Sequence, residues 1–156
     1  MIRKLRFVSV AVPDLDAALA FFQATLGLAA DPGVRDPHHA LHQAHLVVGD
    51  TAIALLQPVE DESPVGRFVQ QRGSGLYHLA FEVDDIELTL HTLLARGAEL
   101  LDREPRDVPG GRIAFVRSRQ MRGILIELWE PANVEATAPD LSADAGLSDS
   151  GAAASS

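Results

Sequence analysis

The chain has 156 residues, of which 47% are hydrophobic and 22% charged, and its formal net charge is −9. This length is typical of one domain with its own core. The lack of cysteine excludes thiol catalysis, disulfides and cysteine-ligated metal centres, and the negative charge argues against a nucleic-acid partner. No apolar run reaches the roughly 18 residues of a membrane span, and the run at 7–12 is too short for a signal peptide, so we expect a cytoplasmic protein without a membrane partner.

The first predicted elements are a strand at 7–12, rich in β-branched residues, and a helix that follows it. Asp14 stands at the expected N-cap of this helix, and Gly27 stands just past its end. Between them lies an apolar stripe at helical spacing, made of Leu15, Leu19, Phe22 and Leu26. Three further strands are expected in this half, at 28–30, 41–48 and 51–58.

A short helix is expected next, because Ser63-Pro64 is a favourable N-cap and first-turn pair and Gly73 provides an end. The first strand of the second half is expected near His78. The helix that follows it has Asp85 at the N-cap and Gly97 at the end. The apolar stripe of this helix is made of Ile86, Leu90, Leu93 and Leu94. The remaining predicted strands lie at 99–101, 112–117 and 124–131.

These elements form an internal repeat. Residues 7–16 match 78–87 at an offset of about 71, and residues 51–58 match 124–131 at about 73. Each half is therefore predicted to be a βαβββ module, and neither can bury both faces of its strands alone. We expect an α+β fold in which two paired βαβββ modules form one curved mixed sheet with a central cleft. The predicted boundaries are a single domain at 1–131, modules at about 1–60 and 74–131, and a linker helix at about 64–73.

The last segment, 132–156, differs in composition from the rest. It is rich in Ala, Ser, Gly and Asp and contains no Lys or Arg. Such a segment buries too little apolar surface to offset the conformational entropy lost on folding. We expect a disordered acidic tail here.

Two polar residues interrupt strands that are otherwise apolar. His78 lies within Leu-Tyr-His-Leu-Ala-Phe, and Glu127 lies within Ile-Leu-Ile-Glu-Leu-Trp. If both side chains point into the cleft, the repeat places Phe7 and Ala54 at the corresponding positions of the first half. A buried carboxylate must be paired, hydrogen-bonded, metal-bound or protonated. The pair therefore marks the candidate site.

Three segments carry a resemblance to a known family: GLYHLAFEVDDI at 75–86, GGRIAF at 110–115 and GILIEL at 123–128. They resemble the methylmalonyl-CoA epimerase branch of the vicinal-oxygen-chelate (glyoxalase/bleomycin-resistance) superfamily, over residues 5–131. The resemblance implies paired βαβββ modules, a homodimer, and a divalent metal held in the cleft by two ligands from each half. It also implies an enzyme that removes and returns a proton next to a thioester carbonyl.

Transferred residue by residue, the resemblance places His78 and Glu127 at the two metal-ligand positions of the second half. The two positions of the first half hold Phe7 and Ala54, whose side chains have no donor atom. Gln43 falls where some of these epimerases carry a catalytic glutamate, and an amide cannot act as a general base. With two of four ligand positions replaced, tight metal binding is not expected.

A bound metal and a metal-free polar network remain as alternatives. If a divalent metal is bound, His45 supplies a third ligand beside His78 and Glu127, since its strand parity is right. Without metal, these three residues and Gln43 form a polar network, and no cofactor is expected. The other histidines singled out are expected to have no chemical role: His38, His39 and His91. A set of arginines is either an anion contact or simply solvated: Arg112, Arg117, Arg119 and Arg122.

The primary functional prediction is a metal-independent isomerase- or cyclase-type enzyme acting on a small carbonyl-containing metabolite, with an acyl thioester as the candidate. A carboxyl group buried among apolar side chains has a raised pKa and exchanges protons with a neighbouring imidazole. Glu127 is thus the expected general base or acid, and His78 is its partner. The predicted substrate-binding residues are two that orient the substrate, Gln43 and His45, and four that form an apolar pocket, Phe7, Ala54, Phe115 and Trp129.

Two other functions stay open. One is a metal-dependent methylmalonyl-CoA epimerase with a substitute ligand, which would exchange a substrate proton only with metal present. The other is a non-catalytic small-molecule binding or resistance protein, which would bind a ligand and leave it unchanged.

Overall fold

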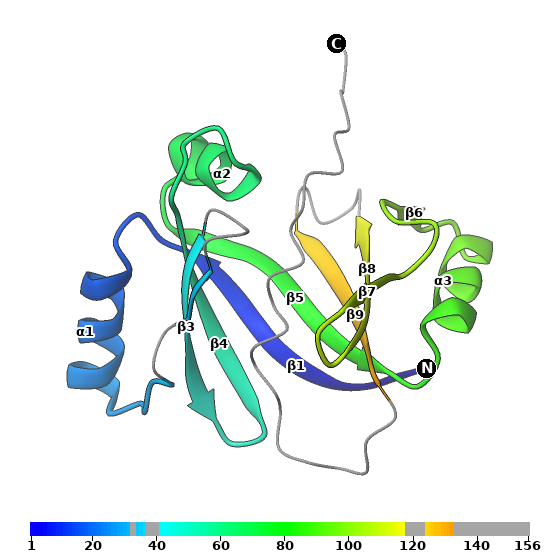
Figure 1. Cartoon of the computed structure of the whole chain (residues 1–156), viewed down its shortest axis with the longest axis horizontal. Coiled ribbons are helices and arrows are strands. Elements are labelled where there is room, and N and C mark those ends of the chain that lie inside the picture. The colour runs from blue at the N-terminus through cyan, green and yellow to red at the C-terminus, as the bar shows by residue number, and fades with distance from the viewer. Residues whose placement is uncertain (32–33, 37–40, 118–123, 133–156) are drawn as a thin grey trace.

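Two long strands, β1 (Ile2–Ala11) and β5 (Gly75–Val83), lie antiparallel at the centre of a curled sheet (Figure 1). This is the arrangement in a computed structural model, which describes residues 1–31, 34–36, 41–117 and 124–132. Within these residues the sheet has nine strands in the order β2-β3-β4-β1-β5-β9-β8-β6, and β7 pairs with β8.

Each central strand has a parallel neighbour from its own half. In the first half β4 (Thr51–Pro58) pairs with β1, and β3 (Leu41–Val48) and β2 (Val34–Asp36) follow antiparallel. In the second half β9 (Leu125–Pro131) pairs with β5, and β8 (Gly111–Arg117) lies beyond it. The short strands β6 (Glu99–Leu100) and β7 (Arg106–Val108) complete this half.

The helices α1 (Leu15–Leu26) and α3 (Ile86–Ala95) flank the curled sheet on opposite sides in Figure 1. The side chains of Asp14 and Asp85 cap these helices, as the sequence predicts, by accepting hydrogen bonds from Ala17 N (2.9 Å) and Leu88 N (2.8 Å). The helix α2 (Pro64–Arg72) begins at the predicted cap Ser63 and joins the two halves.

The sheet has two differently packed faces. The outer face carries the apolar clusters under α1 and α3, which include Leu55 and Leu128 respectively. The inner face carries the neighbouring residues Ala54 and Glu127, as strand alternation requires. The two halves thus form one curved mixed sheet, and the predicted α+β fold is confirmed.

One predicted strand is wrong. Residues 28–30 form only an isolated bridge between Ala30 and Leu46, while Val34–Asp36 pairs regularly with β3. The reason is that β2 pairs with the edge of β3 near Gln43, which leaves the preceding segment one bridge of two backbone hydrogen bonds farther along that strand.

The predicted tail at 132–156 lies outside the described residues except for Ala132. None of the three helices in the described part of the chain has the length and hydropathy of a membrane span.

Candidate functional site

The second half presents a buried histidine and a buried carboxylate side by side on the inner face. On the paired strands β5 and β9, Ala80 is opposite Glu127 and His78 is opposite Leu125, two residues away. The His78 Nε2 atom lies 3.3 Å from Glu127 Oε2, and the two side chains are 0% and 3% exposed. The two side chains that the sequence singled out are therefore in contact and shielded from water.

Ser9 is the third member of this group. Its Oγ lies 3.0 Å from His78 Nε2, because Ser9 and His78 are paired across β1 and β5. The hydroxyl can donate to Nε2 when that nitrogen is bare and can accept from it when it carries a proton. Ser9 therefore tolerates both protonation states of the ring.

This group is not a hydrolase triad. In such a triad the serine and the acid contact opposite nitrogens of the histidine. Here Ser9 and Glu127 both contact Nε2 of His78. The arrangement suits a proton shared between His78 and Glu127 rather than activation of Ser9 as a nucleophile.

The corresponding positions of the first half are apolar. Phe7 is opposite Ala52 on β1 and β4, which is the relation that His78 has to Leu125 on β5 and β9. Phe7, Ala52, Ala54 and Ala80 form one buried cluster at the centre of the inner face. The Phe7 ring therefore fills the space beside three alanine side chains.

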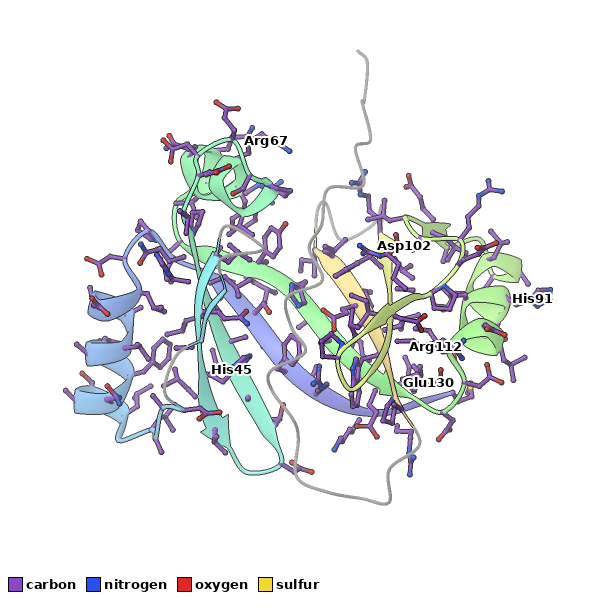
Figure 2. The ribbon with its side chains drawn as sticks, in the orientation of Figure 1. His45, Arg67, His91, Asp102, Arg112 and Glu130 are labelled. Carbon is purple, nitrogen blue, oxygen red and sulfur yellow. The ribbon has the colours of Figure 1, made fainter. Side chains whose placement is uncertain are left out.

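His45 lies across the sheet from the His78–Glu127 pair. His45 on β3 is opposite Ala54 on β4, and it is 3% exposed. Figure 2 labels it beside these two strands. The Phe7 ring contacts both histidines, with centroid distances of 6.2 Å to His45 and 5.5 Å to His78.

The donor set does not fit a divalent metal of the kind that the resemblance implies. Among the described residues no three His, Asp or Glu side chains lie close enough together to hold one. Phe7 and Ala54 contribute no donor, and His78 Nε2 is directed at Ser9 and Glu127. We therefore derive no chemical step through a metal.

Gln43 lies on β3, two residues before His45, and is 2% exposed. Neither its amide nitrogen nor its amide oxygen has a hydrogen-bond partner within the described residues. The predicted polar network therefore does not include Gln43. A buried amide of this kind is costly unless a ligand or water completes it.

Phe115 and Trp129 form an inner-face cluster with Ile113, at the β8–β9 end of the sheet. Phe115 is opposite Glu127, so it borders the candidate pair directly. Its backbone N–H donates to Asp102 Oδ2 at 2.8 Å, which fixes the edge of β8 where β6 stops. The Asp102 side chain (labelled in Figure 2) in turn accepts from Arg106 at 3.2 Å.

Sequence analysis missed two inner-face residues, Arg6 and Tyr77. Arg6 is 1% exposed and Tyr77 is 9% exposed. Desolvation on burial raises the pKa of Tyr77 above 10.0, and Arg67 partly opposes this shift. Simple strand alternation would turn both away from the face that carries Phe7 and His78, and β-bulges bring them back.

The remaining predicted polar residues lie elsewhere. His91 projects from α3 away from the sheet (Figure 2) and is exposed. Arg112 is held between Glu87 and Glu130, whose hydrogen bonds raise its pKa, with the Glu87 bond the larger cause. Glu87, His91 and Arg112 border a cavity of about 530 Å³ beside α3, and its lining includes none of the inner-face residues described above. His38, His39, Arg119 and Arg122 lie outside the described residues.

Comparisons with known proteins agree with this fold. The family model described as Glyoxalase/Bleomycin resistance protein/Dioxygenase superfamily matches residues 7–116. An ethylmalonyl-CoA/methylmalonyl-CoA epimerase of Cereibacter sphaeroides is 33% identical over 131 residues, which cover 82% of this chain and 98% of the relative.

Two solved structures are similar over most of this chain. Methylmalonyl-CoA epimerase from Mycobacterium tuberculosis has a TM-score of 0.73 at 30% identity, covering 85% of this chain and 90% of that one. A methylmalonyl-CoA epimerase in complex with methylmalonyl-CoA and NH4+ has a TM-score of 0.74 at 28% identity, covering 88% and 100%. The chain therefore belongs to the glyoxalase/bleomycin resistance protein/dioxygenase superfamily, in its methylmalonyl-CoA epimerase-like branch, and is an isomerase- or epimerase-like enzyme.

Proposed function

We propose that this protein is an isomerase- or cyclase-type enzyme that moves a proton on a carbonyl substrate, an acyl thioester, without a metal. The observation that carries the proposal is the buried contact of 3.3 Å between His78 and Glu127. A carboxylate and an imidazole that are in contact and shielded from water can act together as an acid–base pair. Keeping such a pair buried costs desolvation, which a proton-transfer role accounts for.

The proposed reaction begins with removal of a proton from the carbon next to the carbonyl. Glu127 takes this proton, and the C–H electron pair moves onto the carbonyl oxygen to give an enolate. His78 holds Glu127 in place through Nε2 and exchanges the proton with it, while Ser9 holds the His78 ring. The pair then returns the proton to carbon, so the reaction consumes no other reactant.

The other inner-face residues are proposed to hold the substrate. Gln43 has an unpaired amide within the described residues, which offers both a donor and an acceptor to a polar group. His45 lies two residues away on the same strand and orients the same polar group of the substrate. Phe7, Ala54, Phe115 and Trp129 are buried side chains of the inner face and supply apolar walls.

The thioester class is supported by the relatives. An ethylmalonyl-CoA/methylmalonyl-CoA epimerase is 33% identical to this chain, and one similar structure is a complex with methylmalonyl-CoA. Malonyl-type thioesters are therefore the first substrates to test. The homodimer and the cytoplasmic location remain predictions.

Epimerisation that depends on a metal is the second candidate, and the similarity to named epimerases favours it. It needs a ligand set other than the four inner-face positions, two of which are Phe7 and Ala54. The non-catalytic binding protein is the third candidate.

The test is solvent deuterium exchange. The purified protein is incubated in D2O with methylmalonyl-CoA or ethylmalonyl-CoA, with a chelator or with added Mg²⁺ or Co²⁺, and label at the α-carbon is measured by mass spectrometry. We expect exchange in chelator that added metal does not increase. Exchange that requires metal would establish the second candidate instead, and saturable binding with no exchange of either thioester would establish the third.

A further inference from the structure

The inner face of the curled sheet is buried over its whole width. From β3 to β9, its large polar and aromatic side chains are at most 7% exposed, as shown by His45, Phe7, His78, Glu127 and Trp129. This burial is produced by the atoms of the chain itself. A sheet face with nothing packed on it is in contact with water, so some part of this chain lies over the inner face.

The described residues cover the two ends of this face. At one end the helix α2 packs on Leu56 and Tyr77. At the other end Leu101 and Val108 pack on the cluster that contains Phe115. Between the ends, the buried cluster consists, among the residues that the structure describes, of strand residues alone: Phe7, Ala52, Ala54 and Ala80.

The burial of Phe7 shows that this centre needs a further cover. The Phe7 ring lies beside the three alanines and is itself 0% exposed. Arg6 lies against the ring, with its guanidinium carbon 5.2 Å from the ring centroid, and is 1% exposed. A ring and a guanidinium at the centre of a sheet face are both shielded from water only when other atoms lie over them.

Length identifies the segment that can supply this cover. The chain outside the described residues comprises 32–33, 37–40, 118–123 and 133–156. The first two are short connections at either end of β2, and the third connects the neighbouring strands β8 and β9. The segment 133–156 is by far the longest, and only its start is tied to the sheet.

This segment also starts at a suitable place. The last described residue, Ala132, directly follows β9 and donates its N–H to Gly110 O at 2.9 Å. β9 is the strand that carries Glu127 and Trp129. The distance across the sheet from β9 to β3 is about 20 Å at roughly 4.8 Å between neighbouring strands, which six or seven extended residues span.

The charges of the segment and of the inner face are complementary. The inner face carries Arg6, His45 and His78, and Glu127 is the one buried carboxylate among the described residues. Each of these four has an interaction besides the contacts named above, so the complementarity belongs to the face as a whole. Polar segments can become ordered when they bind a surface. The segment contains no Lys or Arg and four acids: Glu135, Asp140, Asp144 and Asp149.

We propose that the segment 133–156 docks on the inner face of its own chain and covers the candidate site at Phe7, His78 and Glu127. The inference deepens the proposed function and rests on it in one respect, because a substrate then reaches Glu127 only after it displaces the segment. The docking itself is independent of the reaction.

The full chain is suited to a fluorescence test, because it has no cysteine and Trp129 is its single tryptophan. Ala143→Cys is labelled with a nitroxide, which quenches tryptophan emission at short range. Ala20→Cys, at an exposed position of α1 on the outer side of the sheet, is the matched control. Trp129 emission is measured for each labelled protein alone and in an excess of unlabelled wild type.

A second variant tests the charges. The four acids of the segment are replaced by the corresponding amides, with and without the label at Ala143→Cys. The matched control replaces four exposed acids elsewhere in the chain: Asp16→Asn, Asp31→Asn, Asp61→Asn and Glu104→Gln. Acrylamide quenching of Trp129 is measured in the unlabelled proteins.

We expect labelled Ala143→Cys to lose Trp129 emission relative to labelled Ala20→Cys, with or without the excess of wild type. Neutralising the acids of the segment should restore the emission and expose Trp129 to acrylamide, and the matched control should do neither. Salt at 1 M, where the Debye length is about 3 Å, should act in the same direction. If the proposed function holds, the neutralised segment should also raise deuterium exchange at low methylmalonyl-CoA concentration.

Equal emission from the two labelled proteins would overturn the docking. Quenching that the excess of wild type removes would assign the inner face to the segment of a second copy instead. Quenching of the same size after the acids are neutralised would reflect proximity along the chain and would also overturn the docking. The fluorescence measurements need no substrate, so a failure of the proposed reaction leaves them intact.

Discussion

The two halves of the sheet share their strand pairing but differ in the side chains they present. On β5 and β9 the inner face carries His78 and Glu127, 3.3 Å apart. On β1 and β4 the equivalent positions carry Phe7 and Ala54, which pack together in an apolar cluster. The repeat is therefore a repeat of the backbone, and the buried histidine–carboxylate contact occurs in the second half.

This difference assigns distinct tasks to the halves. The first half supplies a packed apolar centre, and Phe7 contacts the rings of both His45 and His78. The second half supplies the groups that can exchange a proton. The first half also contributes buried polar side chains, Ser9, Gln43 and His45, and a bulge places its Arg6 against the Trp129 ring of β9.

The largest effect is expected on deuterium exchange, when Glu127 of the second half is replaced. Glu127→Gln keeps the shape of the side chain but removes the base, so deuterium exchange should fall roughly 10²- to 10⁴-fold. The control is Glu87→Gln, a carboxylate on α3 that is 67% exposed and bonded to Arg112. Exchange in Glu127→Gln at the wild-type rate would show that the pair is only structural.

In the first half the large effect should be on stability. Phe7→Ala removes a fully buried ring from the centre of the inner face, and the free energy of unfolding should fall by about 3–5 kcal/mol. Phe21→Ala, which removes a ring that is 55% exposed, should change it by less than about 0.5 kcal/mol. Denaturant unfolding measures both, and similar losses would contradict the placement of Phe7.

A smaller effect tests how alike the halves are outside the site. Asp14→Ala and Asp85→Ala each remove one N-cap hydrogen bond, and each should lower the free energy of unfolding by about 1 kcal/mol. The two losses should be nearly equal, since the backbone repeats here. A loss confined to one variant would mean that the helices are not equivalent.

The smallest effect is on stability at alkaline pH and concerns Tyr77. This residue is equivalent to Arg6 in the repeat and is the single tyrosine of the chain. Because burial raises its pKa in the folded protein, its absorbance should titrate above pH 10.0. The folded state then holds the phenol proton at a pH where the unfolded chain has lost it, so stability falls as pH rises above 10.0. Tyr77→Phe should lack this part of the alkaline loss; a titration at or below pH 10.0 would contradict its burial.

Most of the fold could be predicted from the repeat. The offsets of about 71 and 73 match the strand pairing, in which Phe7 faces Ala52 as His78 faces Leu125. Their polarity within apolar strands singled out His78 and Glu127, and alternation then gave the residues that share a face with each of them along its own strand.

Alternation could not predict Arg6, because a bulge adds one residue to one strand without a composition signal of its own. The short strand near residue 30 was also mispredicted, since the edge of β3 can be filled by either of two neighbouring segments. The repeat does give a signal for these two residues. Arg6 and Tyr77 are 71 residues apart and immediately precede Phe7 and His78, so they occupy equivalent positions.

The central claim is that proton transfer here uses His78 and Glu127 and no metal. It is tested most directly by measuring the metal content and the deuterium exchange of methylmalonyl-CoA on one purified sample, before and after chelator treatment. We predict far less than one equivalent of divalent metal and an exchange rate that the chelator leaves unchanged. A full equivalent of bound metal whose removal abolishes exchange would contradict the claim.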